Sequence, residues 1–534
     1  MDPMLVGTFS VFIAFPVSVL LHEVGHAVFG RLAGYTVTSL GIGFGRPWLV
    51  IPLRGVRVYL TTTGPVQGGL TFAFLPRLLP ARLPQMTYIA GGMLVNAALA
   101  GLFLAWWKFL NGNAAFCLAF AAVNGGLTLL SLVPLPVYVG SLPIRTDGAH
   151  MLEVLTTGTQ SYPSPMTIQG LPALRRFLLA VGDTRFLRAY LVSAASDCAA
   201  LGDAERAWSL LDEEGGMPEP RPPHIPAVAS LLRAQIAPML TPPFDAEPFL
   251  EQAATYYRAT GQVKGLDYIE FLRADLRISR VEAAGTALDE LAGRATFKDH
   301  PALGTALLAE RLKAACLASD GPAVTRWLRA FESDRRRRPL PTLDLAVYGT
   351  VAPFYARQGD LDAADAAYLR LLGAIRELAL AWQNPEERAR FLQMQATTLD
   401  ATRDYLESRG RGDEFARFLS STGENATVVM AEERDRKLRR SARRGMLTNI
   451  AVAACLFAPM LVVGVSVPRV LLALGALLAA FTAAGFVYLL IDQTLGRLIP
   501  PLKRAGGAVL LILAASPWLI GPAVSATTLF MSWP

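Results

Sequence analysis

The pentapeptide His22-Glu-Val-Gly-His26 is the feature that most restricts what this chain can fold into. Two histidines four residues apart lie on one face of a helix, where both imidazoles can bind one Zn²⁺. Glu23 is then placed to take a proton from a water molecule that the metal activates. The preceding residues 4–21 carry no charge. The sequence therefore predicts a metal site within a membrane or at its edge.

The composition predicts a membrane protein with a soluble part. The chain has 534 residues, of which 52% are hydrophobic and 17% charged, and this is more apolar than an ordinary soluble protein. The apolar excess lies in roughly the first 135 and the last 90 residues. We therefore predict a mostly α-helical, polytopic membrane protein with about six transmembrane helices, interrupted by a soluble domain of α-helical hairpins.

The first predicted domain, residues 1–155, combines three apolar spans with a strand-rich segment. The spans are residues 4–32, 86–107 and 114–133, each close to the length that crosses hydrocarbon. Residues 35–75 are instead rich in Thr, Val, Tyr and Phe, with glycines between short alternating runs. Such runs predict short strands and hairpins.

The second predicted domain, residues 156–444, is rich in Ala, Leu and Arg and has a helical period. Residues 201–211 and 358–368 each place a glycine turn before a helix with small residues. This pattern is typical of tetratricopeptide-type repeats. We predict an array of helical hairpins, which offers a surface for a protein partner.

The third predicted domain, residues 445–534, contains spans 447–467, 470–491 and 508–530, and its flanking charges set the orientation. Basic residues crowd residues 436–444 and the loop between the last two spans. The positive-inside rule places both clusters in the cytoplasm, so the middle domain is cytoplasmic and the N-terminus lies outside. We expect a multi-pass protein of a bacterial cytoplasmic membrane. The same clusters explain the net charge of +7 without a nucleic-acid partner.

The four cysteines predict no disulfide framework. They lie far apart, without any CxxC pair. Two fall in apolar spans and two in the helical middle, and all read as small buried hydrophobic residues. They are Cys117, Cys198, Cys316 and Cys455.

A catalytic zinc usually takes three protein ligands, so the His pair needs a third. The other histidines are His150, His224 and His300, the last two deep in the soluble middle. A carboxylate beside a hydrophobic span needs a reason, and a metal supplies one for Asp147. Asp147 could also cap the helix that follows it, and His150 reads as an ordinary helix residue.

The ordered motifs of residues 1–155 resemble the site-2 protease family of intramembrane zinc metallopeptidases. The chain has HEVGH in its first span and residues 90–96, AGGMLVN, in its second, similar to the family's AGPxxN segment. Asn124 and the Pro134-x-Pro136 stretch follow in the third span, and Asp147-Gly148 is similar to the family's aspartate-glycine motif.

That resemblance implies an enzyme with a zinc cofactor that cuts a membrane-protein substrate in or near a transmembrane segment. It implies His22, His26 and Asp147 as zinc ligands and Glu23 as the general base. It also implies that the strand-rich segment pairs with the extended substrate. Pocket candidates that could contact the substrate are Asn96, Asn124, Ser131 and Pro134. Asn96 equally fits a helix-packing hydrogen bond, and Asn124 a structural role.

Two departures from the family pattern concern substrate positioning. The family commonly has Asn-x-x-Pro where this chain has Ser131-Leu-Val-Pro134, and the spacer from Pro136 to Asp147 is long. Serine can donate a hydrogen bond but lacks the two-ended pairing of an amide.

Two rival interpretations make different predictions. In the first, the chain is an inactive membrane scaffold that recruits partners through its helical domain, although a purely structural zinc does not require Glu23. In the second, the chain belongs to another membrane class with HExxH, whose third ligand is a glutamate on a downstream helix. That class gives Asp147 no role.

Overall fold

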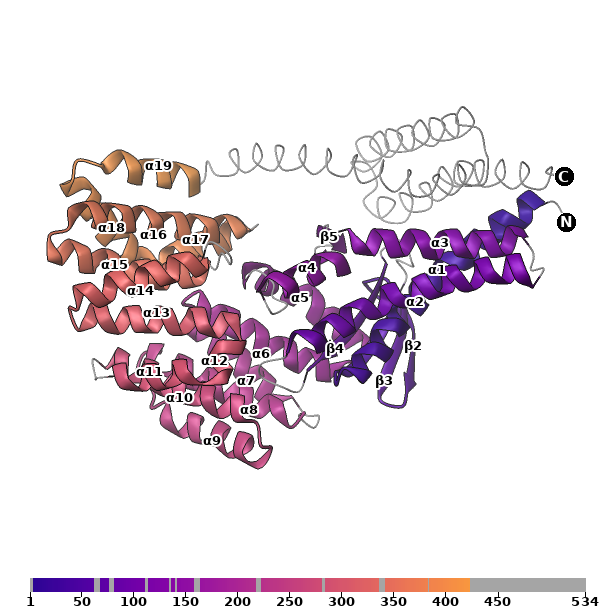
Figure 1. Ribbon diagram of the computed structural model, residues 1–534, viewed down its shortest axis with the longest axis horizontal. Helices are drawn as coiled ribbons and strands as arrows, with labels where there is room; N and C mark the ends of the chain where they lie inside the picture. The colour runs from indigo at the N-terminus through magenta and orange to yellow at the C-terminus, as the bar shows by residue number, and fades with distance from the viewer. Residues whose placement is uncertain are drawn as a thin grey trace. The chain divides into compact units, whose positions relative to one another are not determined.

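The structure of the protein is a computed structural model (Figure 1). It describes residues 3–61, 68–75, 81–110, 114–133, 136–139, 142–157, 164–217, 222–280, 284–335, 341–382 and 384–422. The three predicted C-terminal spans, the basic residues 436–444, Cys455 and Pro134 lie outside these ranges. The chain forms two compact units, one with residues 1–73 and 86–151, the other with residues 74–85 and 152–438, each described with the gaps above.

Three apolar helices of the first unit correspond to the three predicted N-terminal spans. They are α1 (Pro3–Leu32), α2 (Arg82–Phe109) and α3 (Ala114–Leu132). Among the described residues, Ile13–Leu32 and Arg82–Phe109 are long and apolar enough to cross a membrane, while Phe116–Leu132 is shorter. The mostly helical fold with a strand segment after the first helix is therefore confirmed. The total of about six spans stays a prediction.

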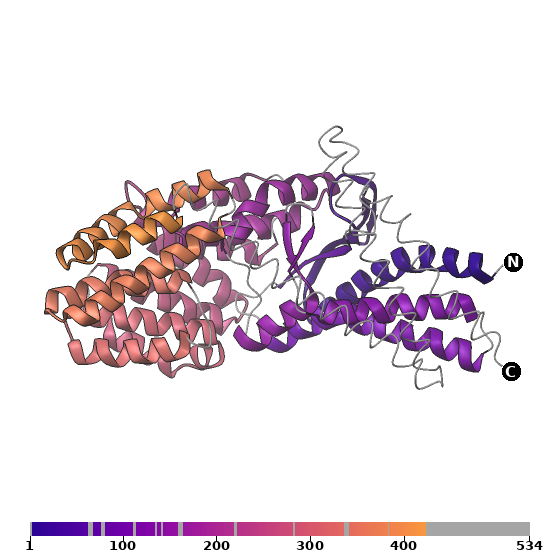
Figure 2. The ribbon, with the colours of Figure 1, turned by 90° about the horizontal axis from the view of Figure 1, so that it is seen from above.

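Small residues let α1 and α2 approach closely in the first unit. A Cβ atom added to Gly25 would lie 2.5 Å from the backbone oxygen of Gly91, and one added to Gly91 would lie 2.6 Å from that of Gly25. Helices in membranes commonly associate through such small residues. The α2–α3 pair is packed instead through aromatic rings, with Phe103 and Phe120 stacked at 4.6 Å between ring centres. All three helices run side by side in Figures 1 and 2.

The strand-rich segment forms a four-stranded sheet with the order β2-β3-β1-β4. The strands are β1 (Thr36–Ile42), β2 (Pro47–Leu53), β3 (Val56–Thr61) and β4 (Gly69–Phe74). The antiparallel β2–β3 pair is the predicted hairpin, but β1 pairs in parallel with β3, which the sequence did not predict. This order leaves β2 and β4 as the two edges. A small core of Ala27, Val37, Leu40 and Val56 joins the sheet to α1.

A second, two-stranded sheet precedes the helix that carries Asp147. Strands β5 (Pro136–Val139) and β6 (Leu142–Arg145) pair in antiparallel fashion and lead directly into α4 (Asp147–Thr157). No strands were predicted between Pro136 and Asp147, because prolines at 136 and 143 weaken the sequence signal for a strand, although an edge position tolerates them.

The second unit is an array of helices, shown in the magenta-to-orange part of Figure 1. After α4 come α5 (Ser164–Val181), α6 (Thr184–Ala200), α7 (Ala204–Gly216), α8 (His224–Ile236), η2 (Ala237–Met239), α9 (Glu247–Ala259), α10 (Val263–Ser279), α11 (Gly285–Gly293), α12 (Ala295–Asp299), α13 (Pro301–Leu317), α14 (Gly321–Arg335), α15 (Pro341–Gln358), α16 (Leu361–Ala381), α17 (Pro385–Met394), α18 (Ala396–Ser408) and α19 (Gly412–Thr422).

The two predicted helix–turn–helix segments are present in this unit. Gly202 and Gly359 take positive φ angles of +88° and +76° at the turns, a conformation that glycine adopts without strain. The following residues, Asp203 and Asp360, cap α7 and α16 by accepting backbone N–H groups. Cys198 and Cys316 are buried free thiols in α6 and α13, as is Cys117 in α3, in agreement with the prediction for these three cysteines.

Ion pairs connect the early and late helices of the second unit. Arg206 of α7 contacts Glu387 of α17 at 2.9 Å, and Arg390 of α17 contacts Asp203 at 3.1 Å. These pairs link positions about 180 residues apart in the sequence. The array therefore brings α7 and α17 together, a long-range contact that the helical period alone does not predict.

Candidate metal centre

The His pair of α1 meets a face of α2 on which Tyr88, Gly92 and Asn96 recur every four residues. The Nδ1 atom of His26 lies 2.9 Å from the backbone oxygen of Tyr88, and the Nδ1 atom of His22 lies 3.0 Å from the Asn96 amide. The two contacts show that α1 and α2 run in opposite directions. Because both Nδ1 atoms face α2 partners, both Nε2 atoms are left to point at a common position.

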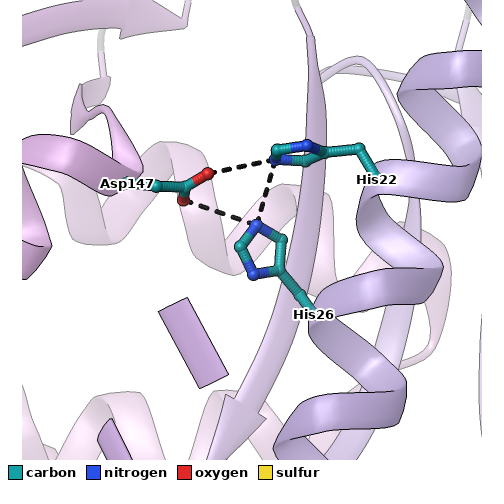
Figure 3. A group of neighbouring side chains, drawn as sticks. All are labelled: His22, His26 and Asp147. Carbon is teal, nitrogen blue, oxygen red and sulfur yellow. Dashed lines mark hydrogen bonds and ion pairs between the residues drawn. The ribbon is translucent and has the colours of Figure 1, made fainter. Parts of the chain in front are cut away.

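Asp147 completes the group from the start of α4, on the other side of that position (Figure 3). Its carboxylate lies 3.1 Å from the Nε2 atom of His22 and 3.4 Å from the Nε2 atom of His26, and the two Nε2 atoms are 3.1 Å apart. Among the described residues, His22, His26 and Asp147 are the His, Cys, Asp or Glu group able to hold a metal ion.

The geometry and chemistry of the donor set fit zinc. Two atoms bound at 2.0–2.1 Å to one tetrahedral ion lie about 3.3 Å apart, close to the 3.1–3.4 Å separations here. The carbonyl of Tyr88 only accepts hydrogen bonds, so a neutral His26 carries its proton on Nδ1 and presents a lone pair from Nε2. This lone pair and the Asp147 carboxylate together are suited to bind a cation.

Gly92 leaves the space that this cation requires. A Cβ atom added at this position would lie 2.5 Å from the Nε2 atom of His22 and 2.6 Å from that of His26. Any larger residue would therefore fill the point where the three ligands meet. Three protein ligands leave a fourth position open, the arrangement of catalytic rather than structural zinc sites.

Asp147 is not the cap of α4, because the preceding Thr146 takes that role. The hydroxyl of Thr146 accepts the N–H of Ala149 at 3.4 Å, while Asp147 is the first helical residue and turns toward the histidines. Burial raises the pKa of the Asp147 carboxyl, the His26 and His22 side chains lower it, and the net result is a pKa below the ordinary value. A carboxylate in this state is ready to bind a cation.

Glu23 is buried and is held by the sheet rather than by the helices. The Thr71 hydroxyl on β4 lies 2.6 Å from the Oε2 atom of Glu23 and 3.1 Å from its backbone oxygen, and it can donate to either. A Cβ atom added to Gly69, at the start of β4, would lie 2.4 Å from Cγ of Glu23. Edge strand β4 therefore packs directly against the Glu23 side chain through Gly69 and Thr71.

The other predicted site residues fall into different places. Asn96 contacts His22, as described above, whereas the Asn124 amide donates to the backbone oxygen of Phe120 in its own helix α3. Ser131 lies near the end of α3, where its backbone oxygen would be 2.9 Å from a Cβ atom added to Gly148. Pro134 lies outside the described residues. His150 is a buried residue of α4 that does not join the donor group.

The structure also adds residues that the sequence analysis missed. Thr71, the backbone of Tyr88 and Gly92 all contact the motif, yet none belongs to it. The four-residue spacing of Tyr88, Gly92 and Asn96 is a usable signal, since it matches the spacing of His22 and His26. Among the described residues, no glutamate of a downstream helix joins the His pair, so the geometry of the second rival class is not found.

Comparison with known proteins gives a family for the part of the chain that holds this site. No curated protein matches the chain. Residues 10–178 match the model of peptidase family M50, a range that includes all three members of the donor group together with Glu23, Thr71 and the face of α2. The match confirms, for residues 10–178, the resemblance to the site-2 protease family, here peptidase family M50, that the motifs predicted.

Proposed function

We propose that the chain is an intramembrane zinc metalloendopeptidase that hydrolyses a peptide bond in or near a transmembrane segment of a membrane protein, as in regulated intramembrane proteolysis. Membership of peptidase family M50 implies a membrane metallopeptidase. The observation that carries the proposal is the convergence of His22, His26 and Asp147 beside a buried glutamate that a hydrogen bond holds in place.

The surface of the three apolar helices supports a membrane setting. Their outward side chains are large and apolar, and the exposed ones include Val28, Leu94, Leu102, Phe109 and Leu130. Their polar side chains are turned inward, because Ser18 of α1, Asn96 of α2 and Asn124 of α3 have no exposed surface. A polar interior with an apolar exterior is the pattern expected of helices that face lipid.

The donor group and Glu23 divide the chemistry of hydrolysis between them. Zn²⁺ held by His22, His26 and Asp147 would supply a Lewis acid that polarises the scissile carbonyl and acidifies water. Glu23 accepts the proton from the attacking water and delivers it to the leaving amine. Thr71 fixes the carboxylate for this transfer, since its hydroxyl contacts Oε2 and leaves Oε1 to act.

Edge strand β4 is the element that we propose holds the substrate. A helical substrate hides its carbonyls in internal hydrogen bonds and must unwind before it can be cut. An unwound segment needs backbone partners, and an edge strand offers them by β-strand addition. Of the two edges, β4 carries the contacts to Glu23, while β2 lies at the opposite side of the sheet.

The orientation and the remaining spans are also part of the proposal. We propose six transmembrane helices in a bacterial cytoplasmic membrane, with the N-terminus outside and the helical array in the cytoplasm, where the array binds a protein partner. The flanking Lys and Arg residues of the sequence support this orientation.

Cleavage by the full chain in proteoliposomes tests the activity. A panel of single-span membrane proteins is incubated with the wild type and with Glu23→Gln, and the products are mapped by mass spectrometry. We expect cuts in or next to the spans for the wild type only. Glu290→Gln, at an exposed position of α11, is the matched control and should cleave like the wild type.

Zinc content separates an inactive scaffold from an enzyme. We expect Glu23→Gln to keep one zinc per chain and Asp147→Ala to lose it, because Asp147 is a proposed ligand and Glu23 is not. Equal cleavage by wild type and Glu23→Gln would reject the proposed peptidase activity. Stoichiometric zinc without any cleavage of the panel would favour the inactive membrane scaffold. Unchanged zinc in Asp147→Ala would reject the ligand assignment.

A further inference from the structure

We propose that Asn96 is a positioning residue for the metal centre, whose side-chain oxygen accepts the Nδ1 proton of His22. This contact directs the Nε2 lone pair of His22 toward His26 and Asp147. The inference rests on the proposed zinc site and gives Asn96 a role different from substrate contact or helix packing.

The location of Asn96 restricts what its amide can do. Asn96 is fully buried on α2, and its amide lies 3.0 Å from the Nδ1 atom of His22. The opposite edge of the His22 ring faces the donor group, with Nε2 3.1 Å from Asp147 and 3.1 Å from His26. Each nitrogen of His22 therefore has its own partner, and Asn96 is the partner of the one that points away from the metal position.

The chemistry of imidazole then decides which end of the amide faces His22. A neutral imidazole has one N–H group and one lone pair. If Nε2 presents its lone pair to a metal, Nδ1 must carry the proton and needs an acceptor. An amide nitrogen cannot accept, so the amide oxygen must lie against Nδ1.

A half-turn of the amide provides this arrangement without any other movement. In the structure Nδ2 is the atom nearest His22, and Oδ1 has no hydrogen-bond partner among the described residues. The oxygen and nitrogen of an amide exchange positions when the group rotates by 180°, and their assignment follows from the hydrogen bonds available. In either orientation only one end of the amide contacts His22. The orientation is therefore decided by the Nδ1 proton of His22, which requires the amide oxygen as its acceptor.

His26 provides the internal comparison. Its Nδ1 atom lies 2.9 Å from the backbone oxygen of Tyr88, one of the acceptors that commonly fix the tautomer of a metal-binding histidine. Tyr88 and Asn96 thus do the same work for the two histidines from the same face of α2. One partner is a backbone atom that substitution cannot remove, whereas the other is a side chain that it can.

Zinc affinity of the full chain in detergent, measured by competition with a chromophoric chelator, tests the role of Asn96. Loss of such a partner typically weakens metal binding about 10–100-fold. We expect this loss for Asn96→Leu and Asn96→Ala, and affinity within about threefold of the wild type for Asn96→Asp, because a carboxylate is an acceptor only. Asn124→Leu, at an equally buried asparagine bonded within its own helix, should bind zinc like the wild type.

A spectroscopic measurement separates positioning from general damage. Replacing zinc by Co²⁺ gives visible absorption bands that report ligand geometry, and we expect altered bands for Asn96→Leu and wild-type bands for Asn96→Asp and Asn124→Leu. The inference fails if Asn96→Leu binds zinc like the wild type, or if Asn96→Asp binds as weakly as Asn96→Leu. By contrast, a wild type that binds no stoichiometric zinc would reject the proposed function itself.

Discussion

The Thr71 hydroxyl lies 2.6 Å from the Oε2 atom of Glu23, so edge strand β4 and the HEVGH helix meet at this glutamate. Tyr88 strengthens this junction, because its hydroxyl donates to the backbone oxygen of Thr71 at 3.0 Å while its own backbone oxygen accepts from His26. A substrate paired to β4 would therefore form hydrogen bonds on a strand that is already connected to both Glu23 and His26.

Removal of the Thr71 hydroxyl should slow cleavage without releasing the metal. A hydrogen bond to a charged group contributes about 1.5–3 kcal/mol, so we expect Thr71→Val to lower kcat about 10–100-fold. Thr71→Ser, which keeps the hydroxyl, should restore most of the rate. Zinc content, measured in parallel, should stay at the wild-type level in both variants. A loss of zinc in Thr71→Val would show instead that the strand supports the ligands.

A methyl group at position 92 should exclude the metal. The added Cβ atom would lie within 2.6 Å of both Nε2 atoms. The close contact of Gly25 with Gly91 keeps the backbone of α2 from moving away from α1 to make room for it. We expect Gly92→Ala to lose most of its bound zinc, as measured by elemental analysis of the purified chain. Gly101→Ala is the matched control in the same helix, because a Cβ atom there meets nothing within 4 Å. Full zinc occupancy in Gly92→Ala would contradict the position assigned to the ion.

The sequence was sufficient for those parts of the site that depend on local spacing. His22 and His26 follow from the four-residue period of one helix, and Glu23 follows from its place beside His22 in the motif. Asp147 lies 125 positions from His22. It was singled out as a carboxylate beside a hydrophobic span, and the resemblance then implied its role as a ligand. The structure places the Asp147 carboxylate against the histidines, because Thr146 and not Asp147 caps α4.

Other features depend on how elements meet, and a single sequence carries little of that information. The parallel β1–β3 pair joins strands that are not neighbours in the chain, and it makes β4 the edge beside Glu23. The role of Thr71 depends on that strand order. The partners of the two Nδ1 atoms depend on the register of α1 against α2, which the close contact of Gly25 with Gly91 sets.

Acid should destabilise the helical unit through His224, the first residue of α8. Burial lowers the pKa of His224 to about 4, against an ordinary value of 6.5, and its ring lies 5.2 Å from that of Phe74. The unfolded chain binds this proton more readily than the folded chain between these two pH values. The free energy of unfolding is therefore unaffected by His224 above pH 6.5 and decreases as the pH falls toward 4, by about 3 kcal/mol.

Thermal unfolding of the full chain in detergent, followed by circular dichroism from pH 8 to pH 4, measures this loss. His224→Gln cannot take up the proton, so its melting temperature should fall less than that of the wild type over the same range. Parallel curves for the two proteins would show that His224 does not contribute to the pH dependence.

Zinc should stabilise the folded chain only while its carboxylate ligand is present. A ligand that binds the folded state alone adds RT ln(1 + [L]/Kd), which is about 2.7 kcal/mol at a hundredfold excess over Kd. We expect the melting temperature of the wild type to rise with added Zn²⁺ and to fall after dialysis against a chelator. Asp147→Ala should melt at one temperature in both conditions, since two histidines alone leave the ion weakly held. Asp362→Ala, at an exposed position of α16, should respond to zinc like the wild type. An equal response in Asp147→Ala would move the third ligand elsewhere.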